Sequence, residues 1–539
     1  MAHKVLTFRS AAREKILRGA SQLADAVRIT LGPKSKSVLI QKQWGNPIVC
    51  NDGVTIAKEI DLEDPEENLG AQMLRQAAEK TGDIVGDGTS TATILAHAIL
   101  ADGIRNVTAG SSAIDIKRGL DRALKMVVDE LKSLSKPVST AREKAQVATI
   151  SAHNDAGIGE LVADAMEKVG GDGVITVEES KTTETVLEVV EGMQFDRGYL
   201  SPYFVTDSEH MEAVLEDAYI MLTDRKINIL KGLVPLLEQA VKAGRPILFV
   251  AEDIESEALA TLIVNQVRGV LKSVAVKAPG FGDRRKAMLQ DMAILTGGQL
   301  ISEELGLRIE DVQLEQLGRA KRVVVDRDHT TLVGGAGERK AIEERMAQLR
   351  REIDQAGSDY DKEKLTERLA KLSGGVAVIR VGAPSESEMK SKKDALDDAI
   401  SATKAAVAEG IVPGGGLALL KTIPALVRLE TQCEGDERTG VQILKRALEA
   451  PARQIADNSA IDGGVVVNKM LEASGNIGFD AARQQYVDLF EAGIVDPTKV
   501  VRVALENAVS VASILLLTEA TMTEKPEARK EAGVPPEAM

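Results

Sequence analysis

A glycine-rich segment with an acid at its centre, Gly86-Asp87-Gly88-Thr89-Ser90-Thr91, is the part of the sequence best suited to bind a phosphate. It leads into a predicted helix over 89–101, and the free N–H groups and dipole of a helix N-terminus attract anions. Asp87 supplies an oxygen ligand of the kind that Mg²⁺ prefers. The same residues are also compatible with an Asp-Gly turn followed by a threonine helix cap, and that alternative stays open.

Other glycine turns are candidates to close around the same ligand: Leu31-Gly32-Pro33, Asp52-Gly53 and Gly414-Gly415-Gly416. Each taken alone is an ordinary turn. Asp397 and Asp398 stand at the start of a predicted helix that ends near Glu409. An acid there could orient a water molecule against a γ-phosphate if the fold brings it close. A solvated acidic helix face is the simpler interpretation of this pair.

Several well-known catalytic and metal-binding patterns are absent from the sequence. There is no GxxxxGK[ST], which excludes a P-loop nucleotidase, and no GxSxG elbow. The five histidines show no HExxH or HxH spacing, and the two cysteines, Cys50 and Cys433, form no CxxC. The sequence therefore favours neither a histidine or thiolate metal site nor a disulfide framework.

The charge balance and the lack of leader-like segments indicate a cytosolic protein. The net charge is −15, which argues against a general affinity for nucleic acid or anionic membranes. The basic clusters Arg284–Lys286 and Lys390–Lys393 are short and flanked by acids, as on solvated faces. The N-terminus has no apolar signal core, and the most apolar stretch, Val511–Leu517, is shorter than a membrane span.

With 539 residues, the chain is long enough for several domains, and its expected secondary structure changes along its length. Helical spacing is expected at both ends, over 11–30, 68–80, 89–101, 395–409, 440–455 and 499–521. Short β-branched runs alternate with helices from 173 to about 382, including 174–177, 186–190, 247–250, 273–276, 322–325 and 376–381. The sequence thus predicts a helical domain built from both termini, with an α/β module inserted between them.

The segments that cross between these parts contain residues suited to hinges. They are Ser135-Lys136-Pro137, Gly374-Gly375, Gly410 and Gly414–Gly416. A hinge at each crossing would let the middle move as a body. The charged, proline-containing segment 524–539 is expected to be a disordered tail.

Aromatic residues are only 2% of the chain, yet Phe195, Tyr199, Tyr203 and Phe204 fall within ten positions. Two apolar stripes follow: Leu233, Val234, Leu236 and Leu237, then Leu259, Leu262, Ile263 and Val264. Stripes of this spacing usually pack in a core. An exposed groove that binds apolar chains is the alternative, and periodicity does not decide between them.

Taken together, these segments resemble a known family. They are Thr30–Pro33, Asn51-Asp52-Gly53, Gly86–Thr91, Gly414–Gly416 and the highly specific run Lys277-Ala-Pro-Gly-Phe-Gly-Asp-Arg-Arg285. The chain is similar to the group I chaperonins, the GroEL family, from about residue 3 to about 523. The resemblance implies a multidomain α plus α/β chaperonin fold: an equatorial ATP-binding domain (1–134 and 411–523), an intermediate hinge domain (135–190 and 377–410) and an apical domain (191–376).

The resemblance also implies site residues. ATP would lie against Thr30, Leu31, Gly32, Pro33, Asn51, Asp87, Gly88, Thr89, Ser90, Thr91, Gly414, Gly415, Asp480, Ala481, Ala482 and Asp496. Asp87 would hold Mg²⁺, with K⁺ as a further candidate cation, and Asp398 aided by Asp52 would position the attacking water. Non-native polypeptides and the loop of a small heptameric GroES-like co-chaperonin would bind Tyr199, Tyr203, Phe204, Val234, Leu237, Leu259, Ile263 and Val264.

Two stacked seven-membered rings are the assembly that the resemblance implies. Arg197 would pair with Glu386 across neighbouring subunits, Asp83 with Arg327 between domains, and Arg453 and Asp462 would lie near the contact between rings. Three features depart from the family: Asn51 replaces a Lys of its best-known member, Asp480 replaces the usual Asn, and the tail lacks Gly-Gly-Met repeats.

The function expected from this resemblance is ATP-dependent capture and folding of non-native chains inside a ring cavity. A second hypothesis is a paralogue that keeps the fold and mainly holds particular partners. A third, a monomeric metal-dependent phosphotransferase, would need a small-substrate pocket that nothing in the sequence supplies. Asp52, Asp87 and Asp398 are all present, which favours the cycling chaperone. Clients, specialisation and single versus double rings stay open.

Overall fold

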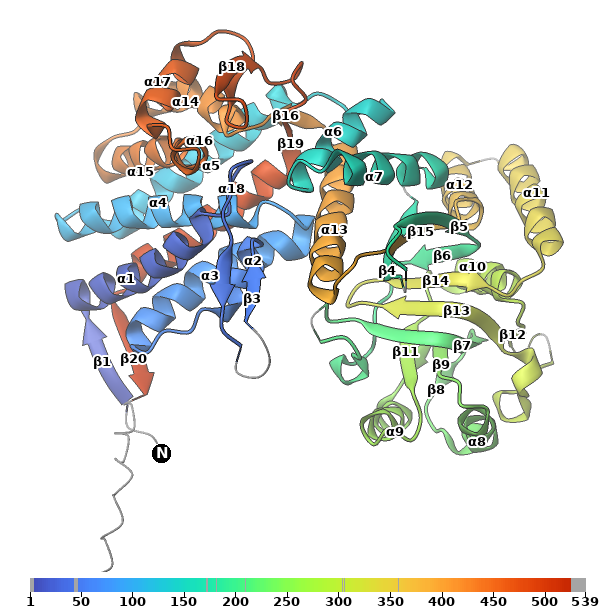
Figure 1. Ribbon diagram of the computed structural model, residues 1–539. Helices are drawn as coiled ribbons and strands as arrows, with labels where there is room; N and C mark the ends of the chain where they lie inside the picture. The colour runs from blue at the N-terminus through green and yellow to red at the C-terminus, as the bar shows by residue number, and fades with distance from the viewer. Residues whose placement is uncertain are drawn as a thin grey trace, which may run out of the picture. The chain divides into compact units, whose positions relative to one another are not determined.

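The structure is a computed structural model, which describes residues 4–42, 47–170, 173–180, 182–208, 210–302, 304, 306–356 and 358–524. The chain forms two compact units (Figure 1). Residues up to Asp164 and those from Pro384 onward build the first, and Ala165–Ala383 build the second. Both ends of the chain therefore contribute to one unit. The expected division into three domains stays a prediction.

The first unit is mainly helical. Its helices are α1 (Arg9–Arg28), α2 (Gly53–Glu59), α3 (Pro65–Val85), α4 (Thr89–Thr108), α5 (Ala113–Leu134), α6 (Ala141–Ser151), α13 (Glu386–Glu409), α14 (Leu417–Glu430), α15 (Gly435–Ala447), α16 (Ala450–Asn458), α17 (Gly463–Glu472) and α18 (Thr498–Leu517), and α7 (Ala156–Val169) begins in it. Its strands form four two-stranded antiparallel sheets: β1 (Lys4–Phe8) with β20 (Ala520–Glu524), β2 (Val38–Ile40) with β3 (Ile48–Cys50), β16 (Ile411–Pro413) with β19 (Val495–Pro497), and β17 (Ile477–Asp480) with β18 (Gln485–Asp488).

Small residues let the helices of this unit approach closely. A Cβ atom on Gly19 of α1 would lie 1.7 Å from the Glu67 carbonyl oxygen of α3, and one on Gly70 would lie 2.1 Å from that of Ile16. Buried alanines fill much of the same core, including Ala20, Ala24 and Ala77. Close helix contacts built from Gly and Ala explain how a large core forms with so few aromatic side chains.

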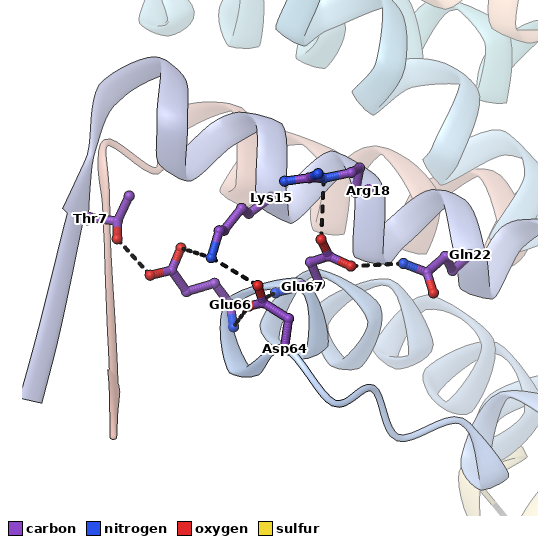
Figure 2. A network of polar contacts seen from close by, with 7 residues as sticks. All are labelled: Thr7, Lys15, Arg18, Gln22, Asp64, Glu66 and Glu67. Carbon is purple, nitrogen blue, oxygen red and sulfur yellow. Dashed lines mark hydrogen bonds and ion pairs between the residues drawn. The ribbon is translucent and has the colours of Figure 1, made fainter. Parts of the chain in front are cut away.

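A polar network fixes the start of α3 against α1 and β1 (Figure 2). Asp64 caps α3 by accepting from the Glu66 and Glu67 amides, and its carboxylate also pairs with Lys15 at 2.8 Å. This hydrogen bond raises the pKa of Lys15 and lowers that of Asp64. Thr7 of β1 donates to Glu66 at 2.6 Å, so the ribbon of the two chain ends is joined to the helical core.

Helix α18 is the one helix of the described residues that is long and apolar enough to cross a membrane by length and composition. The expectation that no stretch reaches this length is therefore wrong. Of its most apolar window, 67% is buried inside the protein, and the helix packs against α3, α4 and α5. The buried side of the helix is apolar for this reason, whereas Arg502 on the same helix pairs with Glu409 and Glu506.

The second unit is an α/β structure around a seven-stranded mixed sheet. The sheet contains β6 (Gly192–Phe195), β7 (Ala213–Thr223), β9 (Ile247–Ala251), β11 (Ser273–Lys277), β12 (Leu300–Ile301), β13 (Gly318–Val325) and β14 (Thr330–Gly335). A smaller sheet has the order β4 (Val174–Glu179), β15 (Val376–Val381), β5 (Val186–Val190), and β8 (Lys226–Ile227) pairs with β10 (Asp253–Ile254). The helices are α8 (Val234–Ala243), α9 (Ser256–Val267), α10 (Gly282–Thr296), α11 (Arg339–Gln355) and α12 (Asp359–Ser373).

A buried ion cluster joins α10 to α11 and α12. Asp291 accepts from Arg345 at 2.7 Å and from two nitrogens of Arg368 at 2.8 and 3.0 Å. The carboxylate is almost fully buried, and paired guanidinium groups replace the water that it loses. Helices α11 and α12 are thereby fixed to α10, which packs on the sheet.

Several element boundaries differ from the sequence expectations. The helix expected over 395–409 begins at Glu386, capped by Ser385, so Asp397 and Asp398 lie in its middle. The helix expected over 440–455 is two helices, because the chain turns before Pro451. The helix expected to reach 521 ends at Leu517, and strand β20 follows. Glu524 belongs to β20 and not to a disordered tail, while 525–539 lie outside the described residues.

Candidate phosphate site and exposed apolar surface

The glycine segment lies between α3 and α4 and exposes the start of α4. Gly86 and Gly88 both have left-handed backbones, with φ of 69° and 78°. Side chains are excluded as well, because a Cβ on Gly86 would meet Ser401 at 2.3 Å and one on Gly88 would meet Val500 at 2.7 Å. Since Gly88 caps α4 without a side chain, the amides of Thr89, Ser90 and Thr91 are available to an anion.

Asp87 stands at the entrance to this helix, and its carboxylate is held on both oxygens. One oxygen accepts from the Gly88 amide, and the other accepts from the Ser151 hydroxyl at 2.7 Å. Ser151 is the last residue of α6, 64 positions away along the chain. The sequence analysis missed Ser151, because an isolated serine at a helix end carries no signal of its partner.

Acidic side chains from three other segments surround Asp87. Burial and the charges of Asp87 and Asp52 raise the pKa of Asp398, on α13, well above its ordinary value. Burial and the Asp87 charge raise the pKa of Asp496, on β19, to about 7. Like charges in a poorly hydrated place repel one another, and a bound cation relieves that repulsion. The predicted acids thus come together from positions more than 400 residues apart.

The segments around Thr30 and Asp52 also reach this place. The Thr30 hydroxyl lies 2.9 Å from that of Ser90, and a Cβ on Gly53 would lie 2.4 Å from the Ser90 oxygen. Asp52 caps α2 by accepting from the amides of Val54 and Thr55. Leu31, Gly32 and Pro33 form the loop that follows α1, and Asn51 directly precedes Asp52.

The C-terminal segments complete the site. Val412 of β16 pairs with Asp496, and a Cβ on Gly414 would lie 3.1 Å from the Asp496 carboxylate. Gly415 has a φ of 61°, and the carbonyl of Phe479 lies near it. Asp480 is buried and accepts from the amides of Ala482 and Arg483, so its carboxylate shapes the turn that contains Ala481.

The residues present fit Mg²⁺ bound together with phosphate oxygens. No three His, Cys, Asp or Glu side chains of the described residues form a complete metal cage. Mg²⁺ commonly uses one or two protein carboxylates and takes its other ligands from phosphates and water. Burial, followed by the charge of Asp87, raises the pKa of both Asp398 and Asp496, so their ionised forms are disfavoured, and a cation held by Asp87 would stabilise them.

The contact between rings that is expected near Arg453 and Asp462 involves other subunits and stays a prediction. Arg453 pairs with Glu449 of its own helix at 2.8 Å, and Asp462 caps α17. Both side chains therefore have partners within the chain. The pairs Arg197 with Glu386 and Asp83 with Arg327 would each join one unit to the other, and they stay predictions.

A second candidate site is a set of exposed apolar side chains on the second unit. Figure 1 shows α8 and α9 on the same side of the main sheet. Leu233, Leu236 and Leu262 are buried in the core, and the same two helical regions leave other apolar side chains in solvent. The exposed members are Val234 (44%), Val241 (42%), Val264 (45%) and Val267 (67%), with Tyr203 (69%) on the turn beside α9.

The predicted polypeptide-binding residues divide by burial. Tyr203, Val234 and Val264 are exposed, whereas Tyr199, Leu237, Leu259 and Ile263 are partly buried against the core. Phe204 is fully buried. Its expected contact with a bound chain is therefore corrected to packing beneath the surface. The structure also exposes Val267, which the sequence analysis did not single out.

The family of the chain follows from its similarity to known proteins. Residues 23–526 match the TCP-1/cpn60 chaperonin family. The chain is 74% identical to Chaperonin GroEL 5 of Bradyrhizobium diazoefficiens over 531 residues, which are 98% of each protein. The chain therefore belongs to the TCP-1/cpn60 chaperonin family, and it is a chaperonin, an ATPase that assists protein folding.

Proposed function

We propose that this chaperonin captures non-native polypeptides on the exposed apolar side chains of its second unit and releases them through ATP hydrolysis in the first. The observation that carries the capture step is the exposure of Tyr203, Val234, Val264 and Val267 next to a complete core. Apolar side chains that the core does not need are typical of interaction sites. They match the apolar segments that unfolded chains expose and native proteins bury.

Hydrolysis uses the acids and amides of the first unit. The amides at the start of α4 bind phosphate oxygens, and Asp87 would hold Mg²⁺, which would neutralise phosphate charge. Asp398 orients the attacking water and accepts its proton, and the nearby Asp52 carboxylate assists. Asp496 and the turn of Asp480–Ala482 lie against the rest of the nucleotide. K⁺ is a further candidate cation.

The assembly belongs to the same proposal. Subunits form a homo-oligomer, as two stacked seven-membered rings, and a small heptameric co-chaperonin closes the cavity over the captured chain. In this proposal the chain has three domains, with hinges at 135–137 and 410 between the part that captures polypeptides and the part that hydrolyses ATP. Lys136 and Ile411 pair through their backbones, so both crossings of the chain are already adjacent. The location proposed is the cytoplasm, without nucleic-acid or membrane partners.

Recovery of a denatured, aggregation-prone enzyme tests this function. The purified assembly with ATP and a co-chaperonin should restore most of the activity, and the same mixture without ATP should not. Suppressed aggregation without recovery would support the alternative, a paralogue that holds partners. A native mass near 57.5 kDa would contradict the ring.

The variant Val264→Glu should weaken capture of a denatured enzyme by about tenfold or more. A charge placed at a desolvated apolar contact costs more than the lost contact itself. Aggregation measured by light scattering checks this result. Val427→Glu is the matched control, because Val427 is similarly exposed (48%) but lies on α14 of the first unit. Equal aggregation with both variants would contradict the capture surface.

The variant Ser151→Ala should raise the Mg²⁺ concentration needed for half-maximal nucleotide binding by about tenfold or more. The hydroxyl holds one Asp87 oxygen at 2.7 Å, and residues that orient a metal ligand usually contribute about 10- to 100-fold to metal affinity. Ser151→Thr keeps the hydroxyl and should retain most of the affinity. A titration of nucleotide binding with Mg²⁺ measures both, and identical curves for Ala and wild type would contradict the role.

A further inference from the structure

Helix α16 contacts three separate segments of the proposed nucleotide site. Asn458 at its end donates its amide hydrogens to the carbonyls of Arg28 and Leu31, at 2.9 and 2.8 Å. The backbone carbonyl of the next residue, Ser459, accepts from Gln484 at 3.1 Å. Near the start of the helix, Ala452 packs closely on Gly416: a Cβ atom on Gly416 would lie 2.8 Å from the Ala452 nitrogen.

The amide of Asn458 is held in one orientation. Its nitrogen faces two carbonyl oxygens, and its own oxygen accepts from Gln454 at 2.8 Å. Only the NH₂ group can satisfy two carbonyl acceptors, so the geometry fixes which end of the amide points at the loop. Arg28 is the last residue of α1, where carbonyls lack partners within the helix. Asn458 thus caps α1 from a helix 430 positions away.

Packing reinforces this polar contact. Gly32 has a φ of 90°, and a Cβ there would lie 3.2 Å from Ile455, which precedes Asn458 by one helical turn. On the other side, Ala452 and Ala456 belong to the same buried cluster as Phe479 and Ala481. The helix therefore contacts the loop of residues 30–33 through Ile455 and Asn458, and it shares a buried cluster with the turn of residues 480–482.

We infer that Asn458 is a positioning residue for nucleotide binding, and that α16 sets the spacing between loop 30–33 and turn 480–482. This inference rests on the proposed nucleotide site. Asn458 acts through the two carbonyls that it holds and not through the phosphates. Because Asp87 and Asp398 lie on other segments, loss of the Asn458 contacts changes nucleotide affinity and leaves the chemical step intact.

The variant Asn458→Asp tests this role with almost no change in shape. A carboxylate donates nothing, and it repels the two carbonyl oxygens. The dissociation constant for ATP should rise about tenfold, as expected when one or two hydrogen bonds are lost, while kcat at saturating ATP stays within about twofold. Hydrogen exchange at the amides of residues 30–32 should accelerate, which reports the loop itself without any turnover.

Two further variants separate positioning from general damage. Asn468→Ala, on α17, removes an asparagine whose side chain donates to Glu472 of its own helix at 2.8 Å, and this variant should bind ATP like wild type. In Gln484→Asn, the new asparagine tolerates the left-handed φ of 57° at this position, but its side chain is too short to reach the Ser459 carbonyl. Because only this one hydrogen bond is lost, the variant should weaken binding less than Asn458→Asp.

The possible outcomes distinguish this inference from the proposed function. If wild type binds no ATP, the nucleotide site itself is wrong. If wild type binds ATP and Asn458→Asp binds it equally well, the positioning role is overturned and the site stands. Two other results for Asn458→Asp also overturn the inference. One is a fall in kcat with an unchanged dissociation constant, and the other is a lower Tm with both kcat and the dissociation constant unchanged.

Discussion

Replacement of Asp398 by Ala should leave ATP bound and slow its hydrolysis by about a hundredfold or more. Positioned general acid–base groups typically contribute 10²- to 10⁴-fold, and Asp398 has that role in the proposed mechanism. Burial raises the pKa of its carboxyl most, and the negative charges of Asp87 and Asp52 raise it further. Single-turnover hydrolysis and a separate equilibrium binding measurement distinguish the chemical step from affinity.

The neighbouring acid offers a matched control for this prediction. Asp397 lies on the same helix and carries the same charge, so Asp397→Ala should retain hydrolysis. Equal rates for Asp398→Ala and wild type would remove the catalytic assignment. Equal losses from both variants would instead show that the total negative charge of α13 matters and that no single carboxylate positions the water.

Asp398→Asn should also be more stable than wild type at neutral pH. The pKa of Asp398 in the folded chain is above its ordinary value, so folding favours the protonated form. The ionised carboxylate therefore costs stability once the pH exceeds the ordinary pKa, and the cost is complete above the raised one. The gain in Tm should vanish near pH 4 and increase as the pH rises above the ordinary pKa of the carboxyl. Such a gain at the expense of activity is common at catalytic sites.

Replacement of Asp87 by Ala should abolish Mg²⁺-dependent nucleotide binding, with an affinity loss of about a hundredfold or more. Residues that only orient a metal ligand already contribute about 10- to 100-fold, and a direct ligand contributes at least as much. Hydrolysis is lost as a consequence. Calorimetric titration with ATP, with and without Mg²⁺, measures the effect, and the difference between the two titrations should disappear in the variant.

A retained fold is the necessary control for this second variant. Gly86 and Gly88 set the backbone on both sides of Asp87, so the substitution leaves the left-handed turns in place. Asp87→Asn keeps the size of the side chain and an oxygen that can accept from Ser151, and it should lose Mg²⁺ dependence nearly as fully. Unchanged affinity in either variant would contradict the metal role of Asp87.

Local features of the site could be predicted because they depend on neighbours in the chain. Glycines on either side of Asp87 predict a turn that only glycine tolerates, and the structure has φ values of 69° and 78° there. The β-branched runs at 186–190 and 376–381 form strands with those bounds. Backbone sterics and side-chain alternation act over a few residues, so a sequence window contains the necessary information.

Burial and long-range pairing depended on tertiary packing. Phe204 and Tyr203 are adjacent and both aromatic, yet one is fully buried and the other is 69% exposed, since only the position of the sheet and α9 distinguishes them. Asn458 and Ser151 bear no motif, and their partners lie 430 and 64 positions away. Hydrogen bonds of this kind exist only after whole helices have packed, because the apolar faces that place the helices are spread over both ends of the chain.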